Sequence, residues 1–343
     1  MNSSIKRTSV QILLGIVIAL LLANIIYKKY IMIKMPAEKA EVSSKLIKEK
    51  FLSSVNSFGL KKEWVVQTKY RGNKTTQKKQ DSVIYSYKIS VPQDLPIPVI
   101  LNEINSELKN ENVKVISKEE KINGKSLLSI YSKNNLKLTA SFTYIDEMRR
   151  KAGYVGIIVS GLENLNKDEI AKVLNFPELF GYYVVPSKES EEFVKKHLKS
   201  KKEYIVTLND NIGELKYRLE ENYSEPRLKG SIRSIIGSFP KASFILIDDN
   251  SNLYKSSVFN FIANEFEKRK IKLIKKSSLL DITDESKNQM QSNFSNLVKS
   301  SNENWGKVII VPADNFSLIE EEIIKLRKIG YRFINPSQIL LRN

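Results

Sequence analysis

Apolar residues run without interruption near the N-terminus, where VQILLGIVIALLLANIIY, from Val10 to Tyr27, contains no charged residue. A helix of this length would extend roughly 27 Å, which is close to the thickness of a bilayer's hydrocarbon core. No small-x-small cleavage motif precedes the polar sequence, which favours an uncleaved transmembrane signal anchor at residues 10–27 over a cleaved signal. Basic residues flank both sides, so charge leaves the orientation open. The simplest orientation places residues 1–9 in the cytoplasm and the following domains outside it.

After this run the pattern becomes amphipathic and then strand-like. Spaced apolar residues in VSSKLIKEKFLSSV predict a helix, and we interpret residues 28–60 as a juxtamembrane stalk. Residues 61–147 predict a small α+β domain, with one helix, PIPVILNEINSELKN, among the strands EWVVQTKY, SVIYSYKISV, VKVISKE, KSLLSIYS and LKLTASFTYI. The pairs Asn123-Gly124 and Asn134-Asn135 stand where hairpin turns are needed.

Beyond Gly153, short apolar strands alternate with amphipathic helices. The predicted strands are YVGIIVS, GYYVVP, EYIVTL, ASFILID, KIKLIKK and KVIIVP, with a weak closing segment at YRFINP. The predicted helices are NKDEIAKVLN, SKESEEFVKKHLKSK, IGELKYRLEENY, SVFNFIANEFEKRK, ESKNQMQSNFSNLVKSSN and FSLIEEEIIKLRKIG. Continuous apolar strands separated by helices indicate a parallel sheet covered by helices. About seven such units predict an α/β fold, an incomplete (β/α)7 barrel at residues 153–343.

The chain of 343 residues has a formal net charge of +18, which favours anionic partners such as acidic glycans and lipid head groups. The excess is mostly Lys, spread along the chain among Asn, Ile and Ser. Because there is no zinc-finger spacing and no RNP-like aromatic motif, we do not expect a nucleic-acid partner. Neither GxGxxG nor GxxxxGK[ST] occurs, so nothing supports a nucleotide-binding fold.

Cysteine is absent and histidine occurs once. These counts exclude disulfides, cysteine-ligated zinc, a thiol nucleophile and every site that needs two histidines. The single histidine, His197, lies among lysines in SEEFVKKHLKSKK. We interpret it as a solvated residue of a surface helix.

The stretch FILIDDN runs four apolar residues directly into the adjacent carboxylates Asp248 and Asp249. Acids at strand ends are typical of metal-dependent hydrolases, although Asp and Asn are also common turn residues. In the predicted barrel, Asp210 and Asp314 follow strands as well. Convergence of these four aspartates would form a weak all-oxygen site for a divalent cation. The favoured interpretation is that they are solvated loop acids.

The stretch YKISVPQDLPIPVILNEINSEL, together with the order of segments after it, resembles the divergent polysaccharide deacetylase family. The similarity covers roughly Ser82 to the C-terminus. It implies an exported protein of carbohydrate metabolism with a deacetylase-like barrel. In this family the strand ends hold a metal, a carboxylate base and an acid.

The family's ligand-bearing motifs are degenerate in this chain. Its Asp-Asp-hydrophobic-Gly motif corresponds to SGLENL, with Ser160 and Gly161 at the acid positions, and its His-Leu-Pro-Met-Glu motif corresponds to TLNDN, with Thr207 at the histidine. Its Asn-Asn-His-Met-Gly-Ser motif corresponds to LIDDNS, with Asp248 at the histidine. In VPADNFS, Pro312 and Asp314 replace the two histidines of Gly-His-Pro-His-Pro-x-Thr. The resemblance therefore implies a catalytic site that has lost its ligands.

We expect a membrane-anchored, extracytoplasmic pseudoenzyme of the carbohydrate deacetylase type, without a confident catalytic residue or cofactor. It would bind an envelope polysaccharide or an envelope protein at the barrel mouth, with Tyr182, Tyr183 and Trp305 as candidate stacking residues. One alternative is an active metal-dependent deacetylase that uses the altered all-oxygen site. Another is a structural component of an envelope complex.

Overall fold

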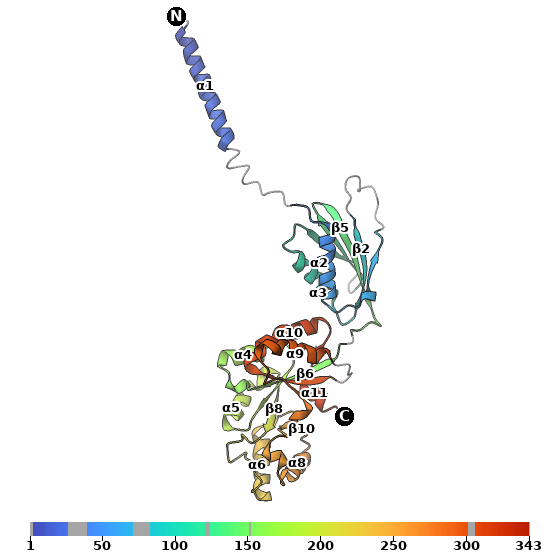
Figure 1. Cartoon of the computed structure of the whole chain (residues 1–343), viewed down its shortest axis with the longest axis vertical. Coiled ribbons are helices and arrows are strands. Elements are labelled where there is room, and N and C mark those ends of the chain that lie inside the picture. The colour runs from blue at the N-terminus through green and yellow to red at the C-terminus, as the bar shows by residue number, and fades with distance from the viewer. Residues whose placement is uncertain are drawn as a thin grey trace. The chain divides into compact units, whose positions relative to one another are not determined.

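The computed structural model describes residues 3–26, 40–70, 83–120, 124–150, 152–300 and 306–342 of the chain. The chain divides into two compact units (Figure 1). Unit 1 comprises Met1–Val55, Lys62–Val91 and Pro96–Tyr144, and unit 2 comprises Asn56–Lys61, Pro92–Leu95 and Ile145–Asn343.

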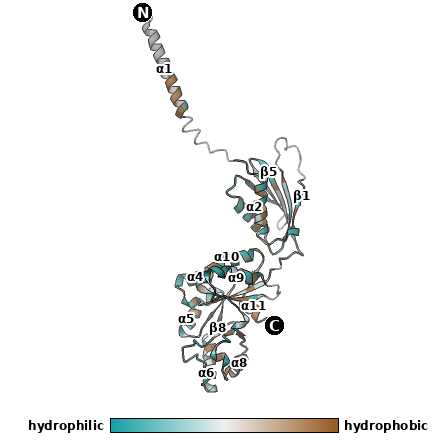
Figure 2. Cartoon of the chain, viewed as in Figure 1, coloured by the Kyte–Doolittle hydropathy of each residue, from teal (hydrophilic) through white to brown (hydrophobic). Residues whose placement is uncertain are grey.

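The N-terminal helix α1 spans Ser3–Ile26, and its side chains are described from Gly15 onward. These side chains are exposed, and Figure 2 shows this part of the helix in the brown of apolar residues. In the described part of the chain, no helix combines the length and the apolar character that a membrane crossing requires. Of the predicted span at residues 10–27, the side chains of residues 10–14 and residue 27 lie outside the description.

Unit 1 contains a five-stranded sheet with the order β1-β2-β5-β4-β3, in which the pairs β1–β2, β5–β4 and β4–β3 are antiparallel. Its strands are β1 (Val65–Thr68), β2 (Tyr85–Pro92), β3 (Lys114–Glu119), β4 (Ser126–Ser132) and β5 (Asn135–Ile145). Its helices are α2 (Ser44–Asn56), the 3-10 turn η2 (Lys62–Trp64) and α3 (Ile97–Leu108). All five strands and the helix predicted for this domain are present.

Helix α2 differs from the predicted stalk, because it is part of unit 1 rather than a spacer before it. Its apolar face is fully buried at Ile47, Phe51 and Val55. The Phe51 ring lies 5.3 Å from the ring of Tyr87 on β2, measured between centroids. The sheet therefore needs α2 to cover its apolar face. Of the predicted stalk, residues 28–39 lie outside the described residues.

The β4–β5 connection is a two-residue hairpin turn in which Ser132 pairs with Asn135. Lys133 and Asn134 both have positive φ angles, 46° and 64°. Positive φ at both central residues is what a type I′ turn requires, and the twist of that turn matches the twist of a hairpin. The turn predicted at Asn134-Asn135 is thus present one residue earlier. Asn123, of the other predicted turn, lies outside the described residues.

Unit 2 is built on a parallel sheet with the order β10-β9-β8-β7-β6-β12-β11, and β13 pairs with β6 as well. Its strands are β6 (Tyr154–Ser160), β7 (Gly181–Val184), β8 (Glu203–Leu208), β9 (Ile245–Ile247), β10 (Leu273–Lys275), β11 (Leu280–Asp281), β12 (Lys307–Pro312) and β13 (Arg332–Phe333). Its helices are α4 (Lys167–Asn175), α5 (Lys188–His197), α6 (Glu225–Ser238), α7 (Asn252–Lys255), α8 (Phe259–Glu267), α9 (Lys287–Lys299), α10 (Phe316–Lys328) and α11 (Pro336–Leu340). The 3-10 turns are η4 (Leu162–Asn164), η5 (Leu198–Ser200), η6 (Lys276–Ser278) and η7 (Ala313–Asn315). Figure 1 shows the strands at the centre of the unit with helices around them.

The strand order is that of an incomplete barrel, because β6, the first strand, pairs with β12, the last long one. The sheet is least regular at β10 and β11. These two short strands are joined by the turn η6 instead of by a crossover helix. Residues 273–275 pair with β9, and residues 280–281 pair with β12. This one segment therefore links both edges of the sheet. The predicted α/β barrel is confirmed at the level of a curled parallel sheet covered by helices.

Apolar side chains pack on both faces of this sheet, which explains why its strands are continuously apolar. One cluster lies between strands and helices and includes Val159 and Phe316. A smaller cluster fills the barrel interior and contains Ile158, Ile205 and Leu246. The interior of the barrel is therefore a packed core.

The helix predicted at residues 212–223 is wrong, because this stretch is an irregular loop. Its apolar residues Ile212, Tyr217 and Leu219 are buried, so their spacing reflects a loop packed on the core. The helix is α6, which begins after Ser224, with proline in its first turn. Proline is well tolerated at that position because no helical N–H bond is lost there.

Candidate functional site

The carboxyl ends of the parallel strands meet at one end of the unit 2 barrel, which is where barrel enzymes carry their functional side chains. Along a strand every second side chain faces the same side. A residue two positions after a member of the interior cluster therefore also points inward. Ile158 and Leu246 belong to this cluster, and Tyr183 and Ile274 pack against it. We call the inward-facing set at the carboxyl ends the mouth layer; it consists of Ser160, Tyr183, Thr207, Asp248, Lys276, Asp281 and Pro312.

Ser160 and Pro312 are direct partners in the β6–β12 register. The Ser160 hydroxyl donates to the backbone carbonyl of Val311 at 3.3 Å, and it also lies beside the Tyr183 phenol. The resemblance implies an acid at Ser160 and an imidazole at Pro312. The structure thus places two of the degenerate positions side by side, with neither a carboxylate nor an imidazole.

Gly161 follows β6 with a φ of +69° and begins the turn η4. A Cβ at this position would meet only the Asn164 amide nitrogen, at an ordinary 3.4 Å. The requirement for glycine therefore comes from its left-handed backbone rather than from space.

Replacing Gly161 with alanine is expected to lower the free energy of unfolding by about 1 kcal/mol, the usual cost of a left-handed non-glycine residue. Gly213→Ala is the matched control, because no atom lies within 4 Å of its Cβ position and its φ is not positive. It should leave stability unchanged or raise it slightly. Chemical denaturation of both variants provides the measurement, and equal effects would contradict the backbone explanation.

Thr207 and Asp248 lie on the neighbouring strands β8 and β9. Thr207 is buried with 4% of its surface exposed, whereas Asp248 is partly buried. One Asp248 carboxylate oxygen accepts the backbone N–H of Asn250 at 3.0 Å. Asp248 thus combines a place in the mouth layer with the role of a turn residue.

The structure does not gather the four aspartates of the predicted cation site. Asp210 accepts the N–H groups of Asn252 and Leu253, at 2.8 and 3.1 Å, at the start of α7. Asp249 faces away from the mouth layer and accepts both the N–H and the hydroxyl of Ser277, which lowers its pKa. Asp314 is exposed on η7.

In the described residues, no group of three or more His, Cys, Asp and Glu side chains is placed to hold a metal. The deacetylase resemblance implies a divalent metal, which would need carboxylate or imidazole donors in the mouth layer. The mouth layer contains no imidazole, and of its two carboxylates, Asp248 and Asp281, the second is paired with the Lys276 ammonium at 2.9 Å. Such a donor set does not fit a zinc or magnesium site.

The predicted stacking role is wrong for Tyr182, which is 1% exposed. Its ring packs edge-on against Phe193 of α5 at 5.8 Å and lies 6.5 Å from the ring of Tyr204. Adjacent strand residues point to opposite faces, so Tyr183 is the one that faces the mouth layer. Trp305 lies outside the described residues.

An ion pair between Lys276 and Asp281 is the main feature that sequence reasoning missed. Lys276 Nζ lies 2.9 Å from Asp281 Oδ2, and Asp281 Oδ1 accepts the N–H and the hydroxyl of Thr283 at 3.0 and 2.7 Å. Partial burial is the largest single effect on the Lys276 pKa and lowers it, but the hydrogen bond to Asp281 and the charges of Asp281, Tyr183 and Asp248 together raise this pKa above its ordinary value. Partial burial likewise opposes charge on Asp281, yet Lys276 and Thr283 hold its pKa below the usual range. Both groups are therefore charged at neutral pH.

Glu163 lies on η4, directly after the end of β6. Burial raises the pKa of its carboxyl, and Oε2 is buried without a hydrogen-bond partner among the described residues. Burial raises the pKa of Tyr183, and the charge of Glu163 contributes to the same shift. Glu163 is therefore a further titratable group near the mouth layer, and no sequence motif identified it.

Two hollows lie among the loops and helices of unit 2, and no mouth-layer residue lines either of them. One, of about 360 Å³, is lined by polar residues of the loops after β8 and β9, among them Asp210 and Asn252. The other, of about 490 Å³, lies between α4 and η7 and includes Asp314. Asp210 and Asp314 thus belong to separate hollows, which is a further reason that they do not converge.

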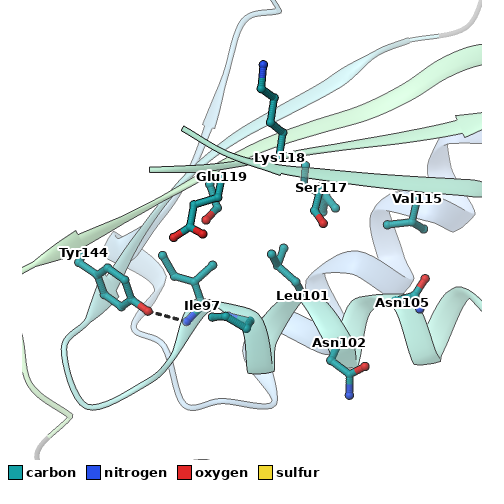
Figure 3. Close-up of a pocket in the computed structure, with 12 residues that line it drawn as sticks. Ile97, Leu101, Asn102, Asn105, Val115, Ser117, Lys118, Glu119 and Tyr144 are labelled. Atoms are coloured by element: carbon teal, nitrogen blue, oxygen red, sulfur yellow. Dashed lines mark hydrogen bonds between the residues drawn. The ribbon is translucent and has the colours of Figure 1, made fainter. Parts of the chain in front are cut away.

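Unit 1 has a hollow of its own, about 630 Å³ in volume, between α3 and β3 (Figure 3). Ile97, Leu101 and Val115 supply apolar contacts, and the Tyr144 hydroxyl accepts the Ile97 N–H at 2.8 Å. Glu119 is the single acid among the 12 residues that line it. The lining therefore lacks the paired acids of a hydrolase and contrasts with the mouth layer, where charged groups gather.

No family model matches the chain, and no curated protein matches it. Among solved structures, the chain is similar to a CE4 family pseudoenzyme from Bacillus anthracis, with a TM-score of 0.38 and 11% identity, over 70% of this chain and 94% of the other. It is similar to a family 4 carbohydrate esterase of Bacillus subtilis, with a TM-score of 0.36 and 11% identity, over 56% of this chain and 82% of the other. It is also similar to the catalytic domain of a peptidoglycan N-acetylglucosamine deacetylase from Eubacterium rectale, with a TM-score of 0.38 and 15% identity, over 56% of this chain and 93% of the other.

Proposed function

We propose that the mouth layer of unit 2 binds an envelope glycan without hydrolysing it. The observation that carries this proposal is the chemistry of the strand ends. Ser160 and Thr207 carry hydroxyls where the family resemblance implies an acid and an imidazole, and Pro312 carries neither. Hydroxyl and charged side chains are suited to hydrogen bonding with sugars. The layer's two carboxylates are already engaged, Asp248 by the Asn250 N–H and Asp281 by Lys276. Neither stands beside the imidazole ligands that would hold the metal for deacetylation.

Two hollows of unit 2 outside the mouth layer offer polar side chains to further sugar units. The hollow between the loops after β8 and β9 presents amides and carboxylates, including Asn209 and Glu221. The hollow between α4 and η7 adds Lys172 and Glu320.

Glycan binding is tested by equilibrium dialysis of the full-length chain, in detergent micelles, against N-acetylated and acidic oligosaccharides. We expect saturable binding, and Tyr183→Phe should weaken it about five-fold because a neutral hydrogen bond contributes about 1 kcal/mol. Tyr223→Phe is the control, because Tyr223 lies outside the mouth layer, where it contacts Arg227. If no oligosaccharide binds while an envelope protein co-purifies in equal amounts, the mouth is a protein-binding surface and the glycan proposal fails.

We also propose that residues 10–27 anchor the protein in a membrane, with both units on the outer side. The support is the sequence: an uncharged run of sufficient length with basic residues at both ends. Reporter fusions at the C-terminus, one active only outside the cytoplasm and one active only inside, test the orientation. Activity of the cytoplasmic reporter alone would reverse it.

A further inference from the structure

Lys276 follows β10 and faces the barrel interior. Ile274 pairs with Leu246 of the interior cluster, so the side chain two residues later lies on the same face. Lys275 lies on the opposite face, where its Nζ is 5.2 Å from the centre of the Tyr254 ring. Two adjacent lysines therefore have different surroundings, and only Lys276 belongs to the mouth layer.

The Lys276 ammonium has more N–H donors than described acceptors. Its one described acceptor is Asp281 Oδ2 at 2.9 Å, whereas an ammonium group carries three N–H donors. Asp248 and Tyr183 are close enough to influence its charge. About a third of the Lys276 side chain is exposed, at 32%. A ligand in the mouth could therefore reach the free donors.

The charges of the mouth layer do not favour an anion. One ammonium stands against two carboxylates, Asp248 and Asp281. A negatively charged sugar would meet both carboxylates, while a divalent metal would be repelled by the ammonium between them. An uncharged ligand, which offers a sugar hydroxyl or an amide carbonyl, avoids both of these charge repulsions.

We propose that Lys276 is the resident cation of the barrel mouth, and that it binds an uncharged oxygen of a neutral glycan without the help of a divalent metal. This inference rests on the proposed function. To the proposed function it adds that the ligand is uncharged and that Lys276 contacts it. Ser160 of β6 and Tyr183 of β7, two strands that pair with each other, supply further hydroxyls to the same ligand.

The test compares full-length wild type, Lys276→Met and Lys275→Met in binding to a neutral N-acetylglucosamine oligosaccharide and to a uronic-acid oligosaccharide. Each titration is made in EDTA and again in Mn²⁺. For wild type we expect neutral-sugar affinities that agree within two-fold in EDTA and Mn²⁺, and uronic-acid binding at least ten-fold weaker. Lys276→Met should weaken neutral-sugar binding at least ten-fold, since a hydrogen bond from a charged donor is the stronger kind. Lys275→Met should change it less than two-fold.

Thermal unfolding of each variant separates loss of binding from loss of folding, and Lys276→Gln retains a donor of similar length if Lys276→Met unfolds. Binding that requires Mn²⁺, tighter binding of the uronic-acid oligosaccharide, or unchanged affinity in a folded Lys276 variant would each overturn the role of Lys276. All three outcomes would leave glycan binding itself intact. Absence of any binding by wild type would instead overturn the proposed function, and the role of Lys276 with it.

Discussion

Replacing Phe51 with alanine is expected to lower the free energy of unfolding of unit 1 by about 3–5 kcal/mol, the usual cost of removing a buried aromatic ring. Phe51 is 0% exposed, and its ring lies 5.3 Å from that of Tyr87. Truncation would leave a cavity between α2 and the sheet. A helix that served only as a spacer would tolerate the same change, so this substitution distinguishes a core helix from a stalk.

The measurement is denaturant unfolding followed by fluorescence of the buried Trp64. The chain has two tryptophans, so the variants are made in a Trp305→Phe background. Leu46→Ala is the matched control on the same helix, because Leu46 is 37% exposed, and it should cost less than about 1 kcal/mol. Equal effects of the two substitutions would show that α2 does not pack as described.

Replacing Arg150 with methionine is expected to destabilise unit 2 by about 3 kcal/mol, since removal of one partner leaves a buried charge unpaired. Arg150 Nε donates to Asp94 Oδ2 at 2.8 Å, and the two side chains are only 7% and 16% exposed. Nη1 also donates to the carbonyls of Phe58 and Lys328, at 3.1 and 2.5 Å. One guanidinium therefore joins three segments of unit 2 that are far apart in sequence.

Native-state hydrogen exchange measures this loss where it occurs, in peptides of unit 2 such as β6 and α10. Arg149→Met removes the neighbouring charge, but Arg149 is exposed, so it should change protection by less than about 0.5 kcal/mol. If Arg150→Met had no larger effect than Arg149→Met, the buried pair with Asp94 would contribute nothing to stability.

The sequence was a good guide where the period of apolar residues was strong. The strands KVIIVP and YVGIIVS form β12 and β6, because continuous apolar runs can only be buried on both faces. The loop that contains Tyr217 was mistaken for a helix, since burial against a core can space apolar residues at helical intervals. Arg150 lies between the two predicted domains, at residues 61–147 and 153–343, and nothing in the local sequence shows that its charge will meet a distant carboxylate.

The candidate site was predictable in place but not in chemistry. Strand order located Ser160, Thr207, Asp248 and Pro312 at the carboxyl ends, where they lie. Whether a residue faces inward depends on register, and a shift of one position exchanges Tyr182 with Tyr183. The same alternation of side chains between the two faces of the sheet places Lys276 in the mouth layer and Lys275 on the opposite face. The partner of Lys276, Asp281, lies beyond the irregular turn η6, so no motif could pair them.

The central claim, that the barrel mouth binds a glycan without deacetylating it, is tested most directly by measuring bound sugar and released acetate in the same samples. The full-length chain is incubated with an N-acetylated oligosaccharide, with EDTA or with added Zn²⁺, Mn²⁺ or Mg²⁺. We predict saturable binding in every sample and acetate at the level of a control without protein. Acetate above that level that rises with protein concentration and with an added divalent ion would contradict the claim.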